Sequence, residues 1–367
     1  MVEIFSEILK RFTSSRVLVI GDLMLDESLW GHIQRISPEA PVPILNLERR
    51  GYTLGGAGNV VRNLKTLGAD VVLLGVLGED STGCEILRLL EKLGVDADGV
   101  LRDPARMSSR KTRMISMEHN QQVFRMDEES THPIDRDQEE AMLGRLEAIL
   151  HGLDAILCSD YLKGVLTERM LQQIFRLARR RGVKVMVAPK DSNRNKYRGA
   201  GILVPNSVEL ARLTGVTLDS SGAWLNTAAA KVLCEMEIQT LLVTRGREGM
   251  SLFEVKAGAI QQVHIPTMAR SVYDVTGAGD TALSAFTLAV AAGTDCETAA
   301  RLANVAAGIV VGKRGTASAT VHEIQERMRE LHPTEWREEE RPLESGRSPS
   351  ELEAGSARVR TGIGAND

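Results

Sequence analysis

A run of small residues that contains two aspartates, Asp274-Val275-Thr276-Gly277-Ala278-Gly279-Asp280, precedes an apolar stretch from Ala282 to Ala292. The pattern predicts a helix with Asp280 in its first turn. Backbone N–H groups at a helix start lack intrahelical partners, so the residues before Asp280 are expected to form an anion hole: Gly277, Ala278 and Gly279. A carboxylate beside a bound phosphate is useful if it accepts the proton of an attacking hydroxyl. The motif therefore predicts phosphoryl transfer, with Asp280 as general base.

A second glycine-rich motif, Gly55-Gly56-Ala57-Gly58-Asn59, leads into a predicted helix. An ordinary junction between a loop and a helix explains it equally well on its own. However, glycines admit a ligand close to the backbone, and Asn59 can donate to and accept from sugar hydroxyls. Carboxylates can grip vicinal hydroxyls in the same way. The residues expected to bind a sugar are therefore Asp22, Asp26, Gly55, Gly56, Asn59 and Lys163.

Asn206-Ser207-Val208-Glu209 directly follows an apolar run and Pro205. Asn206 is well placed to cap a helix, with Glu209 as its capping-box partner. An Asn and a Glu at such a strand end would also suit Mg²⁺, which prefers oxygen ligands and keeps its waters. The two roles are compatible, so Asn206 and Glu209 are expected to hold Mg²⁺ through water.

The elements that position these residues are short apolar runs separated by helical patterns. The runs are residues 17–20, 71–74, 155–158, 183–187, 202–204 and 241–243. Strands that are buried on both faces have this composition, and their alternation with helices predicts an α/β fold with a doubly wound, mainly parallel sheet. Polar residues follow five of the runs, and the carboxyl ends of such strands usually carry the site.

Two segments break the alternation, at about residues 31–54 and 107–127. Three prolines exclude a helix from the first segment, and a His119-Asn120 turn separates two short strands in the second. We expect a small antiparallel β lid over the site. So few strands are not stable alone in water, so the lid is expected to pair with a second copy in a homodimer.

Composition limits the classes of partner. The 367 residues are 43% hydrophobic, and their net charge of −4 gives no general attraction to nucleic acid or to a membrane surface. No apolar stretch is long enough to span a bilayer, which favours the cytoplasm. The four cysteines are widely spaced, as in a protein with reduced core thiols. Residues 1–333 are expected to form the folded domain, and residues 334–367 a polar, disordered tail.

The ordered motifs GGAGN, NSVE and DVTGAGD resemble the PfkB, or ribokinase-like, family of sugar kinases, from about Arg16 to Leu331. The resemblance implies a doubly wound domain with a β lid, ATP as phosphoryl donor, Mg²⁺ as cofactor and Asp280 as base. It leaves a monovalent-cation requirement open. The residues assigned to ATP and its phosphates are Lys190, Asn206, Glu209, Thr244 and Asn304.

Three further segments, residues 35–43, 120–127 and 159–164, are similar to the branch of this family that phosphorylates D-glycero-β-D-manno-heptose 7-phosphate at O1. This resemblance implies a 1,7-bisphosphate product for the synthesis of ADP-heptose and lipopolysaccharide precursors. Some relatives carry a fused nucleotidyltransferase domain, but only a short polar tail follows here, so that second activity is expected to be absent. The alternatives are a fructokinase- or ribokinase-like enzyme and a non-catalytic sugar-binding regulator, although an intact Asp280 argues against the regulator.

The acceptor's own phosphate requires cations, and three lid residues are candidates: Lys111, Arg113 and Arg125. Cross-strand ion pairs with Asp127 or Glu128 explain them equally well. The chain departs from the family at one position, where Ala188 replaces the aspartate of the usual Asp-Pro-Lys. We expect activity to persist, with a changed metal requirement.

Overall fold

The computed structural model describes residues 2–118, 120–219 and 222–331. Within these residues, a nine-stranded sheet has the order β13-β12-β11-β10-β9-β8-β1-β4-β5, and only the β11–β12 and β12–β13 pairs are antiparallel. The strands are β1 (Arg16–Gly21), β4 (Asp70–Gly78), β5 (Val100–Asp103), β8 (Ala155–Ser159), β9 (Lys184–Ala188), β10 (Ile202–Leu203), β11 (Thr240–Thr244), β12 (Met250–Lys256) and β13 (Ala259–Ile265).

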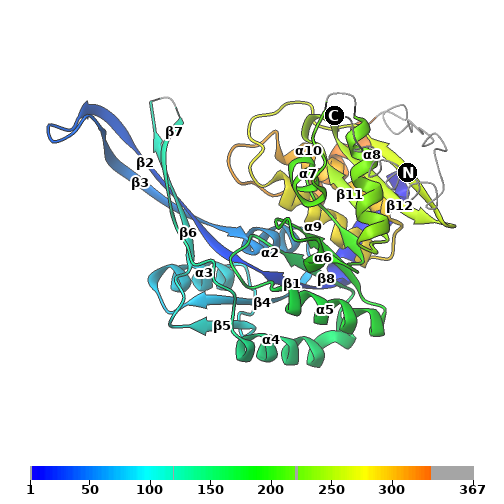
Figure 1. Ribbon diagram of the computed structural model, residues 1–367. Helices are drawn as coiled ribbons and strands as arrows, with labels where there is room; N and C mark the ends of the chain where they lie inside the picture. The colour runs from blue at the N-terminus through cyan, green and yellow to red at the C-terminus, as the bar shows by residue number, and fades with distance from the viewer. Residues whose placement is uncertain (1, 119, 220–221, 332–367) are drawn as a thin grey trace, which may run out of the picture.

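Helices cover both faces of this sheet, which gives the expected doubly wound architecture (Figure 1). One face carries α1 (Val2–Arg11), α2 (Ala57–Thr66), α3 (Ser81–Lys92), α9 (Ala278–Ala291), α10 (Cys296–Val310) and α11 (Val321–Glu330). The other face carries α4 (Arg136–Ile149), α5 (Glu168–Arg181), α6 (Arg194–Tyr197), α7 (Ser207–Thr214) and α8 (Ala223–Ala230).

Successive residues of β1 alternate between two hydrophobic cores. Val17 and Val19 belong to the core under α2 and α9, whereas Leu18 and Ile20 belong to the core under α4 and α5. Burial on both faces explains why the strand is apolar at every position. Short helical turns occur at Phe12–Ser14, Leu150–Gly152, Lys231–Glu235 and Gly246–Glu248.

The lid is a separate sheet in the order β3-β2-β6-β7 and extends from the main domain (Figure 1). Its strands are β2 (Leu23–Ile36), β3 (Pro43–Gly56), β6 (Ser109–Ser116) and β7 (Gln121–Glu128). The β2–β3 and β6–β7 pairs are antiparallel, as expected, but β2 and β6 are parallel. β2 also begins earlier than its predicted segment, because Leu23, Met24 and Leu25 extend the strand into the core.

Two other predicted elements differ from the structure in part. The helix predicted for residues 221–236 is observed as α8 followed by a wider π-helical turn at Lys231–Glu235. In the predicted lid turn, Asn120 has a left-handed φ of 49°, which suits Asn, and His119 lies outside the described residues. The tail predicted for residues 334–367 also lies outside them. Among the described helices, none is long and apolar enough to cross a membrane.

Candidate active site

A cavity of about 140 Å³ lies where the carboxyl ends of β9, β10 and β11 meet the start of α9. Seven residues predicted for catalysis or phosphate binding line it, although they come from four separate stretches of sequence: Lys190, Asn206, Glu209, Thr244, Gly277, Gly279 and Asp280. Tyr161, Ala188, Val204 and Leu283 complete the wall. The polar strand ends therefore converge, as a parallel sheet requires.

Asp280 lies in the first turn of α9 and accepts two hydrogen bonds. Asn59 Nδ2 donates to Asp280 Oδ2 at 2.6 Å, and the Tyr161 hydroxyl donates to Oδ1 at 3.0 Å. Burial raises the pKa of the Asp280 carboxyl, while these donors and the nearby Lys190 act in the opposite direction. A buried carboxylate held by two donors in a cavity wall is well suited to act as a general base.

Asn59 is held in place from α2. Arg62 donates from its NH2 group to Asn59 Oδ1 at 2.7 Å and to the carbonyl oxygen of Thr316 at 2.9 Å. Because Oδ1 accepts from Arg62, the amide nitrogen of Asn59 must face Asp280. In this structure Asn59 therefore contacts the Asp280 carboxylate, and its role as a sugar ligand stays a prediction.

Two of the three residues predicted to form the anion hole line the cavity, Gly277 and Gly279. Gly277 caps α9 with φ = 80°, in the left-handed region that favours glycine. A Cβ at Gly279 would meet no atom within 4 Å among the described residues, so an anion can approach the backbone there. Ala278 does not line the cavity, and its N–H donates to the carbonyl oxygen of Val275. The expectation that Ala278 contributes to the hole is thus corrected.

Asn206 and Glu209 form the predicted capping box at the start of α7. Asn206 Oδ1 accepts from the Glu209 N–H, and Glu209 Oε2 accepts from the Asn206 N–H. Glu209 Oε1 also pairs with Lys190 Nζ. The donor set of amide and carboxylate oxygens fits Mg²⁺, and since each oxygen already has a protein partner, it fits contact through water best. No cluster of three His, Cys, Asp or Glu ligands occurs among the described residues.

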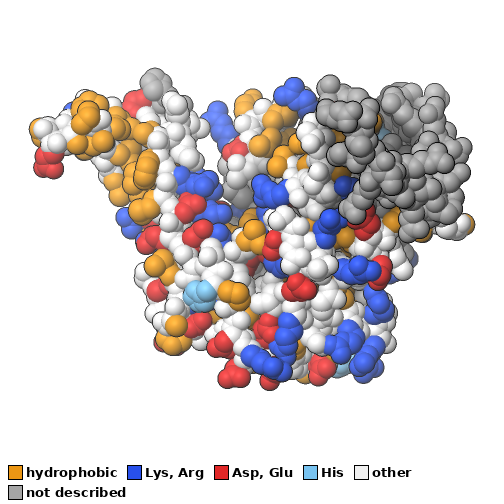
Figure 2. Space-filling model, in the orientation of Figure 1, with side chains coloured by type: hydrophobic (Ala, Val, Ile, Leu, Met, Phe, Trp, Pro, Cys, Tyr) orange, Lys and Arg blue, Asp and Glu red, His pale blue; other side chains and the backbone are white. Residues whose placement is uncertain are grey.

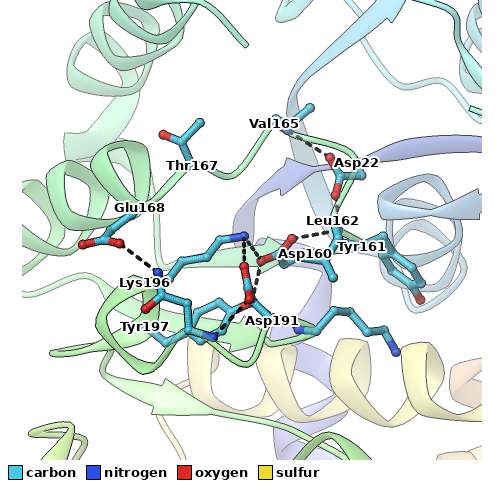
Figure 3. Close-up of polar contacts among 12 residues, drawn as sticks. Asp22, Asp160, Tyr161, Leu162, Val165, Thr167, Glu168, Asp191, Lys196 and Tyr197 are labelled. Carbon is cyan, nitrogen blue, oxygen red and sulfur yellow. Dashed lines mark hydrogen bonds and ion pairs between the residues drawn. The ribbon is translucent and has the colours of Figure 1, made fainter. Parts of the chain in front are cut away.

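The loop after β8 is held by two buried carboxylates (Figure 3). Asp22 accepts from the N–H groups of Tyr161, Lys163 and Val165 at 2.7 to 3.1 Å. Burial and the neighbouring Asp160 raise the pKa of Asp22. Because Asp22 is 1% exposed and both its oxygens are occupied by backbone donors, the sequence-based assignment to sugar hydroxyls is corrected.

Asp160 is the second of these carboxylates. It accepts from Lys196 Nζ and from the Tyr197 hydroxyl, both at 2.6 Å, and from the N–H of Leu162 at 3.0 Å. The Tyr197 hydroxyl in turn accepts from the N–H groups of Lys190 and Asp191. One buried cluster therefore fixes both the backbone of Lys190 and the Tyr161 loop, and Figure 3 shows that loop beside Asp160.

Gly55 and Gly56, in the second glycine-rich motif, have no side chains, and this lets the start of β2 lie close to them. A Cβ at Gly55 would lie 2.6 Å from Asp26 Oδ2, and one at Gly56, where φ is 57°, would lie 2.4 Å from the Asp22 carbonyl oxygen. Asp26 accepts from Arg113 at 2.6 Å. Gly55 and Gly56 therefore make room for β2 in this structure.

The Lys and Arg residues predicted to bind the sugar or its phosphate differ in their ion-pair partners. Arg113 pairs with Asp26, Arg125 with Asp127 at 2.9 Å, and Lys163 with Glu129 at 2.7 Å. Lys111 has no carboxylate within 4 Å in the described part of the chain, and its Nζ lies 5.9 Å from the centre of the Tyr161 ring. Burial lowers the pKa of Lys111.

Asn304, expected near the nucleotide base, is 3% exposed and donates from Nδ2 to the carbonyl oxygen of Pro266 at 2.5 Å. It therefore joins α10 to the end of β13, and the nucleotide-binding assignment is corrected. Sequence reasoning also did not assign roles to Tyr161, Arg62, Lys196 and Tyr197. The sequence signals among them were the place of Tyr161 after a predicted strand and the resemblance of residues 159–164 to heptose kinases, whereas the contacts of the other three depend on the fold.

Comparison with known proteins places the sequence in a family. Residues 14–323 match the pfkB family carbohydrate kinases. The chain belongs to the pfkB family of carbohydrate kinases. The chain is therefore an ATP-dependent carbohydrate kinase.

Among similar proteins, the bifunctional protein HldE of Geotalea uraniireducens is 48% identical over 318 residues, which are 87% of this chain and 64% of that protein. Bifunctional protein HldE of Syntrophotalea carbinolica is 45% identical over 345 residues, 94% of this chain and 69% of that protein. The chain thus spans roughly two-thirds of the length of these relatives.

Solved structures share the fold. Arabidopsis thaliana ribokinase complexed with ribose and ATP superposes with a TM-score of 0.68 at 21% identity, covering 86% of this chain and 98% of that one. Escherichia coli phosphofructokinase-2 in complex with potassium gives 0.70 at 19% identity, covering 85% and 97%. Both comparisons agree with a ribokinase-like α/β fold with a small lid.

Proposed function

We propose that this kinase transfers the γ-phosphoryl group of ATP to O1 of D-glycero-β-D-manno-heptose 7-phosphate, giving the 1,7-bisphosphate for ADP-heptose and lipopolysaccharide precursors. The observation that carries the chemistry is the position of Asp280, beside the start of α9 and in the wall of the cavity. The resemblance of residues 35–43, 120–127 and 159–164 to kinases of this heptose supports the acceptor, as do the relatives named HldE. We place the enzyme in the cytoplasm, where ATP is available.

The proposed reaction is an in-line displacement. Asp280 accepts the proton as O1 of the sugar forms a bond to the γ-phosphorus and the bond from phosphorus to ADP breaks. N–H groups at the start of α9 and Lys190 stabilise charge on the transferring group. Mg²⁺, held through water by Asn206 and Glu209, would neutralise charge on the phosphates.

For the acceptor's 7-phosphate we propose Lys111 as the principal cation. Arg113 and Arg125 already have carboxylate partners, whereas Lys111 has none within 4 Å in the described residues. Figure 2 shows Lys and Arg side chains gathered where the lid meets the main domain. An unpaired, partly buried cation gains most from binding a phosphate, since its charge is not yet compensated.

We also propose a homodimer formed through the lid. Hydrophobic side chains gather on the lid (Figure 2), and Val42, Leu47, Phe124 and Met126 are each more than 40% exposed. An exposed apolar set of this kind on a thin sheet is typical of an interface between copies.

The proposed reaction is tested by ADP release with Mg-ATP and a panel of acceptors: the heptose 7-phosphate, the heptose without phosphate, fructose, fructose 6-phosphate and ribose. Turnover should be highest with the heptose 7-phosphate, with a 1,7-bisphosphate identified by ³¹P NMR. Preferred turnover of fructose, its phosphate or ribose would instead indicate a fructokinase- or ribokinase-like enzyme. Sugar binding with no turnover on any acceptor would favour the non-catalytic regulator.

A further inference from the structure

Tyr161 contacts the proposed base from a rigidly held loop. Asp22 receives the backbone N–H groups of Tyr161, Lys163 and Val165, and Asp160 receives that of Leu162. In Figure 3 the Tyr161 side chain points away from these carboxylates. These hydrogen bonds restrict the Tyr161 backbone, so the point from which its side chain extends is held in place.

The hydroxyl of Tyr161 and the amide of Asn59 occupy different oxygens of the same carboxylate, Oδ1 and Oδ2 of Asp280. The geometry points to Tyr161 as a positioning residue, whose hydroxyl fixes the plane of the Asp280 carboxylate and keeps it ionised for proton abstraction. This inference rests on the proposed function, because it assigns Tyr161 a role in setting the general base.

The direction of the hydrogen bond follows from the chemistry of both partners. Burial, with the charge of Asp280, raises the pKa of Tyr161 well above its ordinary value, so the phenol keeps its proton and donates it. A donor to a carboxylate favours the ionised form and lowers its pKa. Tyr161 and Asn59 thus oppose the effect of burial on Asp280.

Charged groups from the surrounding elements also face this pair. Arg62 on α2 and Lys190 after β9 favour the charged carboxylate, whereas Asp26 on β2 opposes it. Lys190 Nζ lies 5.1 Å from the centre of the Tyr161 ring, and Glu209 on α7 acts on the phenol. None of these groups replaces the donor that contacts Oδ1, so removing the hydroxyl should have a distinct effect.

Tyr161→Phe keeps the ring and removes that donor. The pKa of Asp280 should then rise, because a donor that favours the ionised carboxylate is lost. Since the base must be ionised, the acidic limb of the kcat profile should move to higher pH by the same amount. For each unit of that rise, the loss of kcat at pH values well below both pKa values should be about tenfold larger than on the alkaline plateau. The KM for ATP should change less than about twofold.

Two measurements on the full chain test this inference. The first is the pH profile of ADP release with Mg-ATP and the best acceptor of the panel, for wild type and Tyr161→Phe. The second is a ¹³C NMR titration of aspartate-labelled protein without any sugar, with the Asp280 signal assigned by Asp280→Asn. Tyr52→Phe is a matched control, because the Tyr52 hydroxyl accepts only a 3.4 Å contact from Arg50 within the described residues.

A higher titration midpoint for Asp280 in Tyr161→Phe, with no change in Tyr52→Phe, would support the inference. An unchanged midpoint, or a loss of activity that is equal at low and high pH, would overturn it. Because the titration needs no acceptor, it stays informative even if the heptose phosphate proves not to be a substrate. Thermal melts of both variants show whether the fold is intact.

Discussion

Asp280 is a carboxylate in two settings that usually disfavour negative charge: beside a predicted anion site and in the protein interior. Its position at the start of α9 places negative charge near an anion site, and its burial raises its pKa. Both features suit a group that must take a proton beside a phosphate. The sequence motif predicted this residue, because a carboxylate among the glycines of a helix start has few structural explanations.

Asp280→Asn keeps the size of the side chain and removes the proton acceptor. Turnover should fall roughly 100- to 10,000-fold, the usual contribution of a general base. Binding of Mg-ATP should persist, because the residues of the phosphate side are untouched. Steady-state ADP release and calorimetric titration with Mg-ATP measure the two effects. Near-normal turnover would contradict the assignment of the base.

Ala188 lies in the cavity wall with Lys190 and Glu209, at the position where the resemblance to the family leads us to expect an aspartate. Ala188→Asp should lower the Mg²⁺ concentration that gives half-maximal activity, because a further carboxylate can accept from metal-bound water. Ala188→Asn is the matched control of similar shape without charge. Titration of activity with Mg²⁺ is the measurement, and identical curves for all three proteins would mean that the missing carboxylate has no effect.

Other residue assignments from sequence needed correction for one physical reason. Asp22 and Asn304 have side chains of the right type, but both are buried against backbone partners from other elements. Such partners are set by the tertiary fold, so neither composition nor spacing reveals them. No role was assigned to Tyr161 from sequence, because an aromatic residue after a strand most often belongs to the hydrophobic core.

At the scale of elements, the sequence predicted the alternation of strands and helices well. The apolar runs at residues 17–20 and 155–158 became β1 and β8, because burial on both faces leaves no polar position in them. The lid strands were predicted less accurately at their inner ends. β2 and β3 continue into the core, where their apolar residues look like loop or helix starts when read alone.

Lys111 on β6 provides a test of the lid's role in recognising the acceptor. Lys111→Met keeps the length of the side chain and removes its charge. A charge-assisted contact to phosphate is worth roughly 10- to 100-fold, so the KM for the phosphorylated acceptor should rise by about that factor. The KM for ATP should stay within about twofold.

Arg125→Met serves as the comparison for Lys111, since Arg125 is 51% exposed and paired with Asp127. Initial-rate kinetics with the phosphorylated and unphosphorylated acceptors measure the difference. An equal loss of efficiency on both acceptors in Lys111→Met would exclude a contact to the terminal phosphate. A larger effect in Arg125→Met would assign that phosphate to Arg125.

At the scale of the whole molecule, three layers carry the site and one thin sheet projects from them (Figure 1). Alternation in β7 places Phe124 and Met126 on the face opposite Arg125 and Asp127, which are on the same side as Lys111. Acceptor recognition and pairing between copies can therefore use different faces of the same strands.

The proposed dimer predicts a specific response to charge on this outer face. Phe124 is 58% exposed, and Phe124→Glu should convert the dimer to a monomer, because a buried unpaired carboxylate is costly. Gln121→Glu, a charge change at an exposed site of the same strand, should leave the dimer intact. Sedimentation velocity at micromolar concentration distinguishes the species. A monomeric wild type, or a dimeric Phe124→Glu, would rule out this interface.

β2 runs from Leu23 to Ile36 with no loop between its buried start and its exposed end. Its register with β3 shifts at Trp30/Gly31 and again at Ile33/Arg35, and β6 and β7 shift at Met114/Ile115, directly beside Trp30. The shifts at Trp30/Gly31 and Met114/Ile115 form one line across the lid, beyond Asp26, and the shift at Ile33/Arg35 lies further out along β2. Bending along that line would move the outer lid strands and leave Asp280 and Tyr161 in place, because both belong to the main domain, so the proposed base would keep its position before and after a sugar binds.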